Sequence, residues 1–322
     1  MLVAAFRALA TQLIVISAIT AGTALLAFAV GGTQSAVELL DIGVARMKGP
    51  WVWVFGYGLA SFICKRGRML PRDINGIFEP SDAIAAVTGR IERSTYHRYA
   101  LTYTIPITLL GAVLTNAYGL PAHGISYWIL FAMTCSIYYV AAFVLFNFVE
   151  ITLAFERLLE TVDDVRFKRA YSPMHLENFT GYLALTTALG LIGIYSGFRG
   201  TLTTGFMFQH EMWKTFLSVP LILFLPGALF YDYYPRYVLR KILQHKVFKA
   251  MERLGASDLA DARELVLDIK ESAVIDSQIL PFLDYKSLPS YLLAIFFAIS
   301  LAYNGDPAVT AFIKYLFNLD SP

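Results

Sequence analysis

Charge is scarce in this sequence. Lys, Arg, Asp and Glu make up 16% of the 322 residues, whereas they make up about a quarter of a soluble domain. The scarcity is uneven, because residues 6–30 and 127–148 contain only one charged residue, Arg7. A helix that crosses the ~30 Å hydrocarbon core needs about 20 apolar residues, and only a helix satisfies its own backbone hydrogen bonds in lipid. The sequence therefore predicts an all-α, polytopic membrane protein.

Cysteine is almost absent. The two cysteines, Cys64 and Cys135, lie far apart in apolar stretches and form neither a disulfide framework nor a zinc spacing, so both are interpreted as buried thiols. The motifs of nucleotide-binding loops, nucleophile elbows and zinc proteases are also missing. We therefore expect no enzyme activity, no cofactor, no metal site and no nucleic-acid partner. The expected partner is the lipid bilayer.

Seven apolar stretches are candidates for membrane spans. They cover residues 8–30, 49–64, 99–118, 127–149, 180–198, 213–234 and 289–303. The second and the seventh are shorter than the others. The first is too long for a secretory signal peptide and has no small-residue cleavage site before a polar segment, so we interpret it as a retained span.

The distribution of basic residues predicts an orientation. With the N-terminus in the cytoplasm, seven spans place the C-terminus outside. All but five of the 26 Lys and Arg residues then lie on the inner side; the five are Arg46, Lys48, Arg199, Lys214 and Lys314. This asymmetry follows the positive-inside rule. Compact loops and the absence of sorting or lipidation signals favour a bacterial cytoplasmic (inner) membrane.

The polar segments divide the chain into three parts. Residues 1–235 form a membrane domain with six spans, residues 236–287 a cytoplasmic helical hairpin, and residues 288–322 the last span with a short external tail. Between the second and third spans, turn residues predict an irregular stretch (Pro71, Asn75, Gly76 and Pro80). Ser81 follows as the N-cap of a helix over residues 82–93.

The hairpin is predicted from helix signals at both of its arms. Residues 236–254 continue the sixth span as an amphipathic helix, Gly255 suits its C-cap, and Ser257 suits the N-cap of a helix over residues 258–273. Two interpretations of its basic face stay open. The face rests on anionic lipid headgroups, or it binds a cytoplasmic protein partner.

Polar residues inside a membrane are candidates for function. Asn147 and Glu150 lie three residues apart on one face at the inner end of the fourth span, and Asp232 lies at the inner end of the sixth. Both carboxylates lie near the predicted inner interface, where pairing with an arginine would satisfy them. We expect a nearby Arg to pair with each of them.

Three prolines lie in the interior of predicted spans, away from their ends. Pro106 is in the third span, and Pro220 and Pro226 are in the sixth. Each removes one helical hydrogen bond, so these spans are interrupted-helix candidates of the kind that transporters use at matched positions of inverted repeats. Simple kinks are the alternative interpretation.

The last span carries a stripe of small residues at every fourth position, namely Ser290, Ala294, Ala298 and Ala302. Such stripes allow close helix packing. The neighbouring helix is then in the same chain or in another subunit, or the stripe lines a pore, which Ser300 and Asn304 at the outer end favour. Residues 307–319 are predicted to form a short amphipathic helix outside.

Three functions remain compatible with these features. The first is a non-enzymatic channel-like or pore-forming homo-oligomer with the last span near its axis. The alternative is a non-conducting membrane component or scaffold of a larger envelope, secretion or defence assembly, which docks a partner through residues 236–287. The third is a transporter that uses the proline-containing third and sixth spans.

Overall fold

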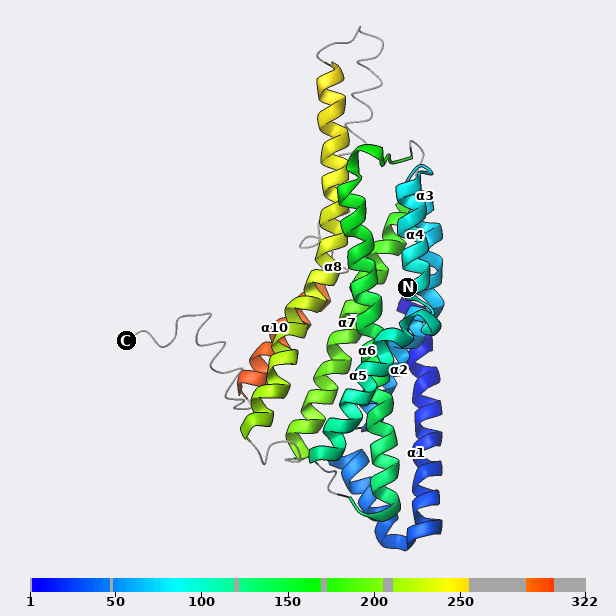
Figure 1. Ribbon diagram of the computed structural model, residues 1–322, viewed down its shortest axis with the longest axis vertical. Coiled ribbons are helices and arrows are strands. Elements are labelled where there is room, and N and C mark those ends of the chain that lie inside the picture. The colour runs from blue at the N-terminus through cyan, green and yellow to red at the C-terminus, as the bar shows by residue number, and fades with distance from the viewer. Residues whose placement is uncertain are drawn as a thin grey trace, which may run out of the picture.

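A computed structural model describes residues 2–46, 49–118, 122–168, 173–204, 211–254 and 288–303 of the protein. Its long helices lie side by side along the long axis of the molecule (Figure 1). Apart from one antiparallel bridge between Phe78 and Phe167, the described residues contain no β-structure. The prediction of an all-α fold is confirmed. The predicted second arm of the hairpin and the external helix lie outside the described residues.

The helices follow one another along the chain as α1 (Leu2–Leu39), η1 (Leu40–Arg46), α2 (Gly49–Arg66), η2 (Gly67–Met69), α3 (Leu70–Ile77), α4 (Asp82–Ser94), α5 (His97–Tyr118), α6 (Gly124–Glu160), η3 (Val162–Asp164), α7 (Pro173–Thr204), α8 (Glu211–Leu254) and α10 (Leu288–Tyr303). Each predicted span lies within one of these helices, in the order α1, α2, α5, α6, α7, α8 and α10. α6, α7 and α8 are longer than the spans predicted within them. They extend the bundle beyond the apolar segments at its upper end in Figure 1.

Within the residues that the structure describes, two helical segments are long and apolar enough to cross a membrane, Phe6–Val44 and Gly124–Glu160. A buried core helix of a soluble protein can meet the same criteria, so the burial of each segment matters. Only 11% of the most apolar window of the first segment is buried, against 39% for the second. The first segment therefore presents most of its apolar residues to its surroundings. The other five predicted spans stay predictions.

The irregular stretch predicted from Pro71 to Pro80 is wrong over residues 70–77, which form the helix α3, whereas residues 78–81 are non-helical as predicted. Proline is tolerated in the first turn of a helix, where its missing N–H has no helical acceptor. Leu70, Ile74 and Ile77 are buried on one side of α3, so packing against α7 outweighs the turn preference of the Asn-Gly pair. Next to it, the predicted cap is confirmed, since the Ser81 hydroxyl accepts a 3.3 Å hydrogen bond from the backbone N–H of Ile84 at the start of α4.

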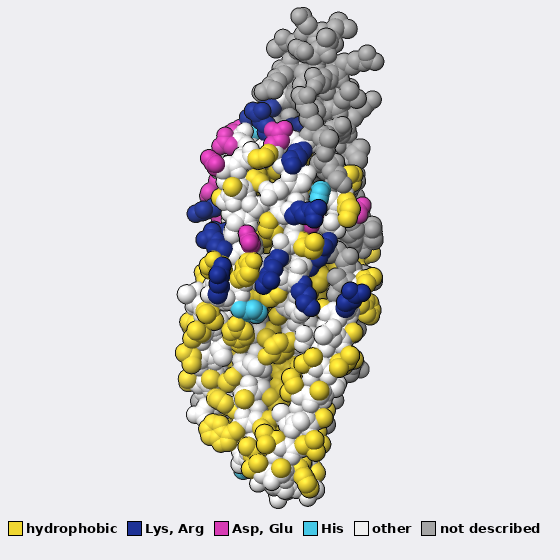
Figure 2. All heavy atoms as spheres, turned by 90° about the vertical axis from the view of Figure 1, so that its right-hand side faces the viewer, with side chains coloured by type: hydrophobic (Ala, Val, Ile, Leu, Met, Phe, Trp, Pro, Cys, Tyr) yellow, Lys and Arg dark blue, Asp and Glu magenta, His cyan; other side chains and the backbone are white. Residues whose placement is uncertain are grey.

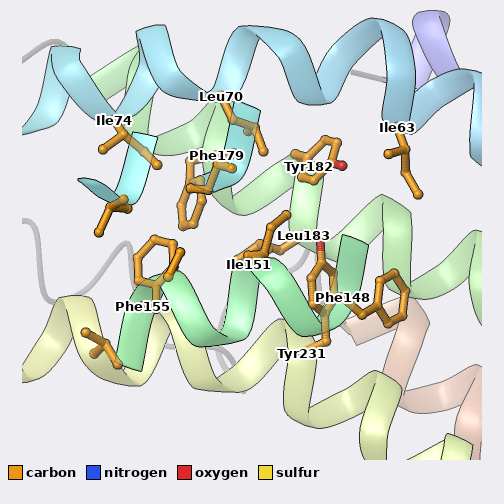
Figure 3. Close-up of a cluster of buried hydrophobic side chains, with 14 of the residues drawn as sticks. Ile63, Leu70, Ile74, Phe148, Ile151, Phe155, Phe179, Tyr182, Leu183 and Tyr231 are labelled. Carbon is orange, nitrogen blue, oxygen red and sulfur yellow. The ribbon is translucent and has the colours of Figure 1, made fainter. Parts of the chain in front are cut away.

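The main core joins α2, α3, α4, α6, α7 and α8 and contains stacked aromatic rings (Figure 3). The rings of Phe148 and Tyr231 lie 4.0 Å apart between centroids and are almost parallel, and those of Phe155 and Phe179 lie 5.2 Å apart. Such pairs contribute about 0.5–1.5 kcal/mol each beyond the area they bury. The core therefore fixes α6 against both α7 and α8.

The surface has two chemically different halves (Figure 2). On the face shown, hydrophobic side chains cover the lower half, and Lys, Arg, Asp and Glu gather over the upper half. The exposed apolar side chains of α1 and α5 include Phe6, Ile14, Leu25, Leu109 and Val113. A soluble monomer rarely exposes apolar residues over so much of its surface.

Candidate functional site

Buried polar side chains collect at one level of the bundle and form what we call the polar cluster. Its members are Ser94, Asn147, Thr180, Tyr182, Thr186, Tyr231, Asp232, Arg236 and Ser290, each at most 1% exposed. They come from α4, α6, α7, α8 and α10. Neighbouring helices alternate in direction, so the end of one predicted span and the start of the next meet at this level (Figure 1).

The most strongly polar part of the cluster is an ion pair within α8. Arg236 donates from Nε to Oδ1 of Asp232 over 3.1 Å, and neither side chain is exposed to solvent. Arg236 also donates from Nη2 to the backbone oxygen of Thr180 on α7 over 2.9 Å. A buried charge is tolerated only when it is paired and hydrogen-bonded. The pair therefore neutralises Asp232 and ties α8 to α7, in agreement with the Arg partner expected for this carboxylate.

Asn147 connects three helices. Its Nδ2 donates to Oγ of Ser94 on α4 over 2.8 Å, and its Oδ1 accepts a 3.4 Å hydrogen bond from the hydroxyl of Tyr182 on α7. Tyr182 in turn lies beside Tyr231 and Thr186, and its ring stacks on Phe62 with the centroids 5.5 Å apart. The tyrosines thus combine an apolar ring with a polar end inside the bundle (Figure 3).

Glu150 lies one turn after Asn147 on α6 and also bonds to α4. Its two carboxylate oxygens accept hydrogen bonds of 2.7 and 3.3 Å from Nε and Nη2 of Arg90, so an arginine does pair with it, although this arginine belongs to another helix. Arg90 and Ser94 are one turn apart on α4. The face shared by Asn147 and Glu150 is therefore the face that holds α4 against α6.

The described part of the small-residue stripe faces its own chain. Ser290 is buried and its Oγ donates to the backbone oxygen of Ala184 on α7 over 3.0 Å, and Ala294 is buried beside it. On the other side of α10, Leu292 and Ile295 are exposed. The side chains of Ala298, Ser300 and Ala302, as well as Asn304, lie outside the described residues. In its first half, the stripe therefore packs against a neighbouring helix of the same chain.

The prolines lie within helices that continue through them. Pro106 is exposed inside α5, and Pro220 and Pro226 are inside α8, with Pro226 exposed. Neither helix is interrupted at these positions.

The chemistry of the cluster is that of helix packing. Among the described residues, no group of three or more His, Cys, Asp and Glu side chains is placed to hold a metal ion. Both cysteines are half-buried rather than buried, and Sγ of Cys64 lies 3.4 Å from Nε2 of His97. Asp232 and Glu150 are each engaged by an arginine. The cluster therefore fixes the relative positions of five helices.

Searches of protein-family models, curated proteins and solved structures find no match to this chain. The function is therefore inferred from the residues themselves.

Several members of the cluster were not found by sequence reasoning, namely Ser94, Thr180, Tyr182 and Tyr231. Their partners are 35 residues or more away in the sequence. The order of the spans along the chain contained a signal for these residues. Polar residues at the end of one span and at the start of the next are expected to meet, because the helices are antiparallel.

Proposed function

We propose that this protein is a multi-pass integral membrane protein with seven transmembrane helices, α1, α2, α5, α6, α7, α8 and α10. The exposed apolar surface of α1 carries this proposal. Phe6, Ile14 and Leu25 are each about two-thirds or more exposed (68%, 73% and 69%). Lipid is the solvent that suits such a surface, and the charge-free half of the face in Figure 2 supports the same choice.

The proposed orientation places the charged half of the molecule in the cytoplasm. The ends of α2, α6 and α8 and the starts of α5 and α7 then lie inside, and the N-terminus lies inside as well. The basic residues of these segments satisfy the positive-inside rule. The proposed location is a bacterial inner membrane, with the C-terminus outside.

α8 is longer than the membrane is thick, which supports a cytoplasmic part that projects from the membrane. Its 44 residues correspond to about 66 Å at ~1.5 Å per residue, roughly twice the hydrocarbon thickness. Near its end, Lys249 and His245 contact Oδ1 of Asp163 over 2.6 and 2.8 Å. The hydrogen bond from Lys249, and then that from His245, hold the pKa of Asp163 below its usual value. The end of α8 is thereby attached to the segment that follows α6.

We propose that this cytoplasmic part docks a protein partner and that the protein is a non-conducting, non-enzymatic component of a larger membrane assembly. The exposed side chains of Phe248 and Met251 lie among basic residues on the projecting part of α8. Aromatic and Met side chains surrounded by charge are typical of docking surfaces. Phe248 and Met251 both lie within residues 236–287, the segment that the sequence predicts to dock a partner.

The alternative is a pore-forming homo-oligomer around α10. The exposed face of α10 carries Leu288, Leu292 and Ile295, which suit lipid better than water. The polar Ser290 faces α7 instead. The transporter function has less support, because α5 and α8 continue without a break through their prolines.

The membrane topology is tested first by labelling single cysteines in a variant that lacks Cys64 and Cys135. His123→Cys and Arg93→Cys are at opposite ends of the bundle, and both native side chains are exposed. A membrane-impermeant maleimide added to intact spheroplasts should label His123→Cys, and should label Arg93→Cys only after permeabilisation. Equal labelling of both before permeabilisation contradicts the proposal.

The docking role is tested with a photo-crosslinking amino acid at Phe248, and at Leu109 as a lipid-facing control. We expect an adduct of one defined mass from Phe248 that Met251→Glu abolishes, and no protein adduct from Leu109. If the photo-crosslinking amino acid at Phe248 forms no protein adduct in the otherwise wild-type protein, docking is contradicted. Discrete current steps from the purified protein in planar bilayers support the pore-forming oligomer instead.

A further inference from the structure

Two arginines share one aromatic ring at the charged end of the bundle. Cζ of Arg68, in η2, lies 4.4 Å from the ring centroid of Tyr96, and Cζ of Arg98, in α5, lies 5.4 Å from the same centroid. Arg98 also lies 4.6 Å from the ring centroid of Tyr99 and donates to its hydroxyl over 3.0 Å. Arg68, Tyr96, Arg98 and Tyr99 form what we call the arginine cluster.

The arginine cluster brings positive charge together without a carboxylate. In the part of the chain that the structure describes, neither arginine of the cluster forms an ion pair, whereas Arg90 and Arg236 each have one. Because each Cζ lies within 5.4 Å of the same ring centroid, the two positive charges are no more than about 10 Å apart, and they repel each other. An anion with several oxygen atoms would relieve this repulsion, and a phosphate suits the planar, forked donors of arginine.

The depth of the cluster matches that of a lipid headgroup. Arg68 follows the predicted second span by four residues, and Arg98 directly precedes the predicted third span. Tyrosine and arginine are both common at this level of a membrane protein. The partly exposed Tyr99 has the amphipathic ring that suits the boundary between headgroups and acyl chains.

An apolar stripe leads away from the cluster along the same helix. Leu101, Ile105 and Leu109 are exposed on α5, at 42%, 49% and 60%. They follow Arg98 at steps of three, four and four residues, which is the spacing of one helix face. A molecule held at Arg98 through its phosphate would therefore have an apolar surface beside it for a hydrocarbon chain.

We propose that Arg68 and Arg98 bind the phosphate of an anionic phospholipid whose acyl chain lies along Leu101, Ile105 and Leu109. The inference rests on the proposed membrane location of α5. A soluble phosphate ester would engage the same arginines. The apolar stripe is the reason to assign the phosphate to a lipid.

The experiment measures lipid retention by the purified full-length protein with native mass spectrometry, after exchange into phosphatidylglycerol or phosphatidylcholine nanodiscs. The Arg68→Ala/Arg98→Ala variant should retain phosphatidylglycerol about 25-fold less, since each basic residue near an anionic surface contributes roughly a fivefold effect. Arg93→Ala is the matched control. Its side chain is exposed on α4 and bonds only within that helix, to the backbone oxygen of Gly89, so its retention should stay within about twofold of wild type.

Two further results distinguish lipid from free phosphate. Ile105→Ser should reduce phosphatidylglycerol retention, whereas soluble glycerol phosphate should compete poorly with the lipid. Full competition by glycerol phosphate, or an unchanged retention in Ile105→Ser, overturns the assignment to a lipid. Equal losses in Arg93→Ala and in the double variant overturn the site itself.

A wrong membrane location and a wrong lipid site would give different results. A wild-type protein that stays soluble without detergent and does not float with phosphatidylcholine vesicles would contradict membrane insertion. A protein that floats, but whose double variant retains phosphatidylglycerol as wild type does, contradicts only the lipid site.

Discussion

Arg236 lies one helical turn after Asp232 on α8, and the two fully buried side chains form a 3.1 Å ion pair. The same guanidinium reaches across to the backbone of Thr180 on α7. A carboxylate and a guanidinium that are removed from water depend on each other, because each would otherwise be an uncompensated charge. This relationship makes the junction of α7 and α8 sensitive to single substitutions.

Arg236→Met is expected to destabilise the protein by about 3–5 kcal/mol, because it leaves the Asp232 carboxylate buried without its partner. The Asp232→Leu/Arg236→Met variant should recover most of this loss, since it removes both charges and keeps similar volume. Unfolding in mixed micelles with an increasing fraction of SDS measures both. A double variant that is less stable than Arg236→Met would contradict the interpretation.

Asn147 and Ser94 are expected to be energetically coupled through their 2.8 Å hydrogen bond. Asn147→Ala should cost about 1–3 kcal/mol, because Ser94 and Tyr182 each lose a partner in a buried position. Ser94→Ala in the Asn147→Ala background should then cost less than it does alone. A double-mutant cycle on the same unfolding assay should give a coupling energy of about 0.5–3 kcal/mol. Strictly additive losses would contradict a direct bond.

The helices were predictable from sequence because they depend on local signals. Long apolar stretches and the Ser81 cap are read from neighbouring residues, and these predictions are confirmed as helices by the structure. The prediction failed at residues 70–77, where the buried Ile74 and Ile77 favour a helix despite the turn residues around them. There, burial against a distant helix outweighs local preference.

The candidate site was only partly predictable. Asn147, Glu150 and Asp232 were found because polar residues in apolar stretches are conspicuous. Their partners Ser94, Arg90 and Tyr182 belong to other helices, and no local pattern relates them. The pairing of Asp232 with Arg236 could be predicted, because the two residues lie one turn apart on one helix.

Gly111→Val is expected to separate α5 from α6. A Cβ atom at Gly111 would overlap the ring of Tyr138, and the overlapped atoms include Cγ, which is close to the tyrosine backbone and not at the far end of its side chain. The matched control is Gly89→Ala on α4, where nothing lies within 4 Å of the added Cβ. The control should stabilise the protein by about 0.5–1 kcal/mol, since glycine weakens a helix interior. The mixed-micelle assay compares the stability of the two variants. A Gly111→Val variant as stable as wild type would contradict close packing of α5 against α6.

The contact of Asp163 with Lys249 and His245 is expected to depend on pH in one direction. These partners lower the pKa of Asp163 below its ordinary value of 3.8, so the attraction is complete above that value. The attraction is lost as the pH falls through the lowered pKa that Asp163 has in the folded protein. A spin label at Met251→Cys, in a background without Cys64 and Cys135, should therefore keep its mobility from pH 7 to pH 5 and gain mobility only below about pH 3.8.

Asp163→Asn should give that mobile state at pH 7, because the neutral amide keeps the shape of the side chain but loses the charge. Asp164→Asn is the matched control, since Asp164 is a neighbouring exposed carboxylate in η3. It removes the same charge from the same turn and should leave the label unchanged. Because Asp163 is exposed, added salt should weaken the wild-type contact and have little effect on Asp163→Asn. Equal mobility in the two variants would mean that the general charge of this turn, rather than the contact at Asp163, holds the end of α8.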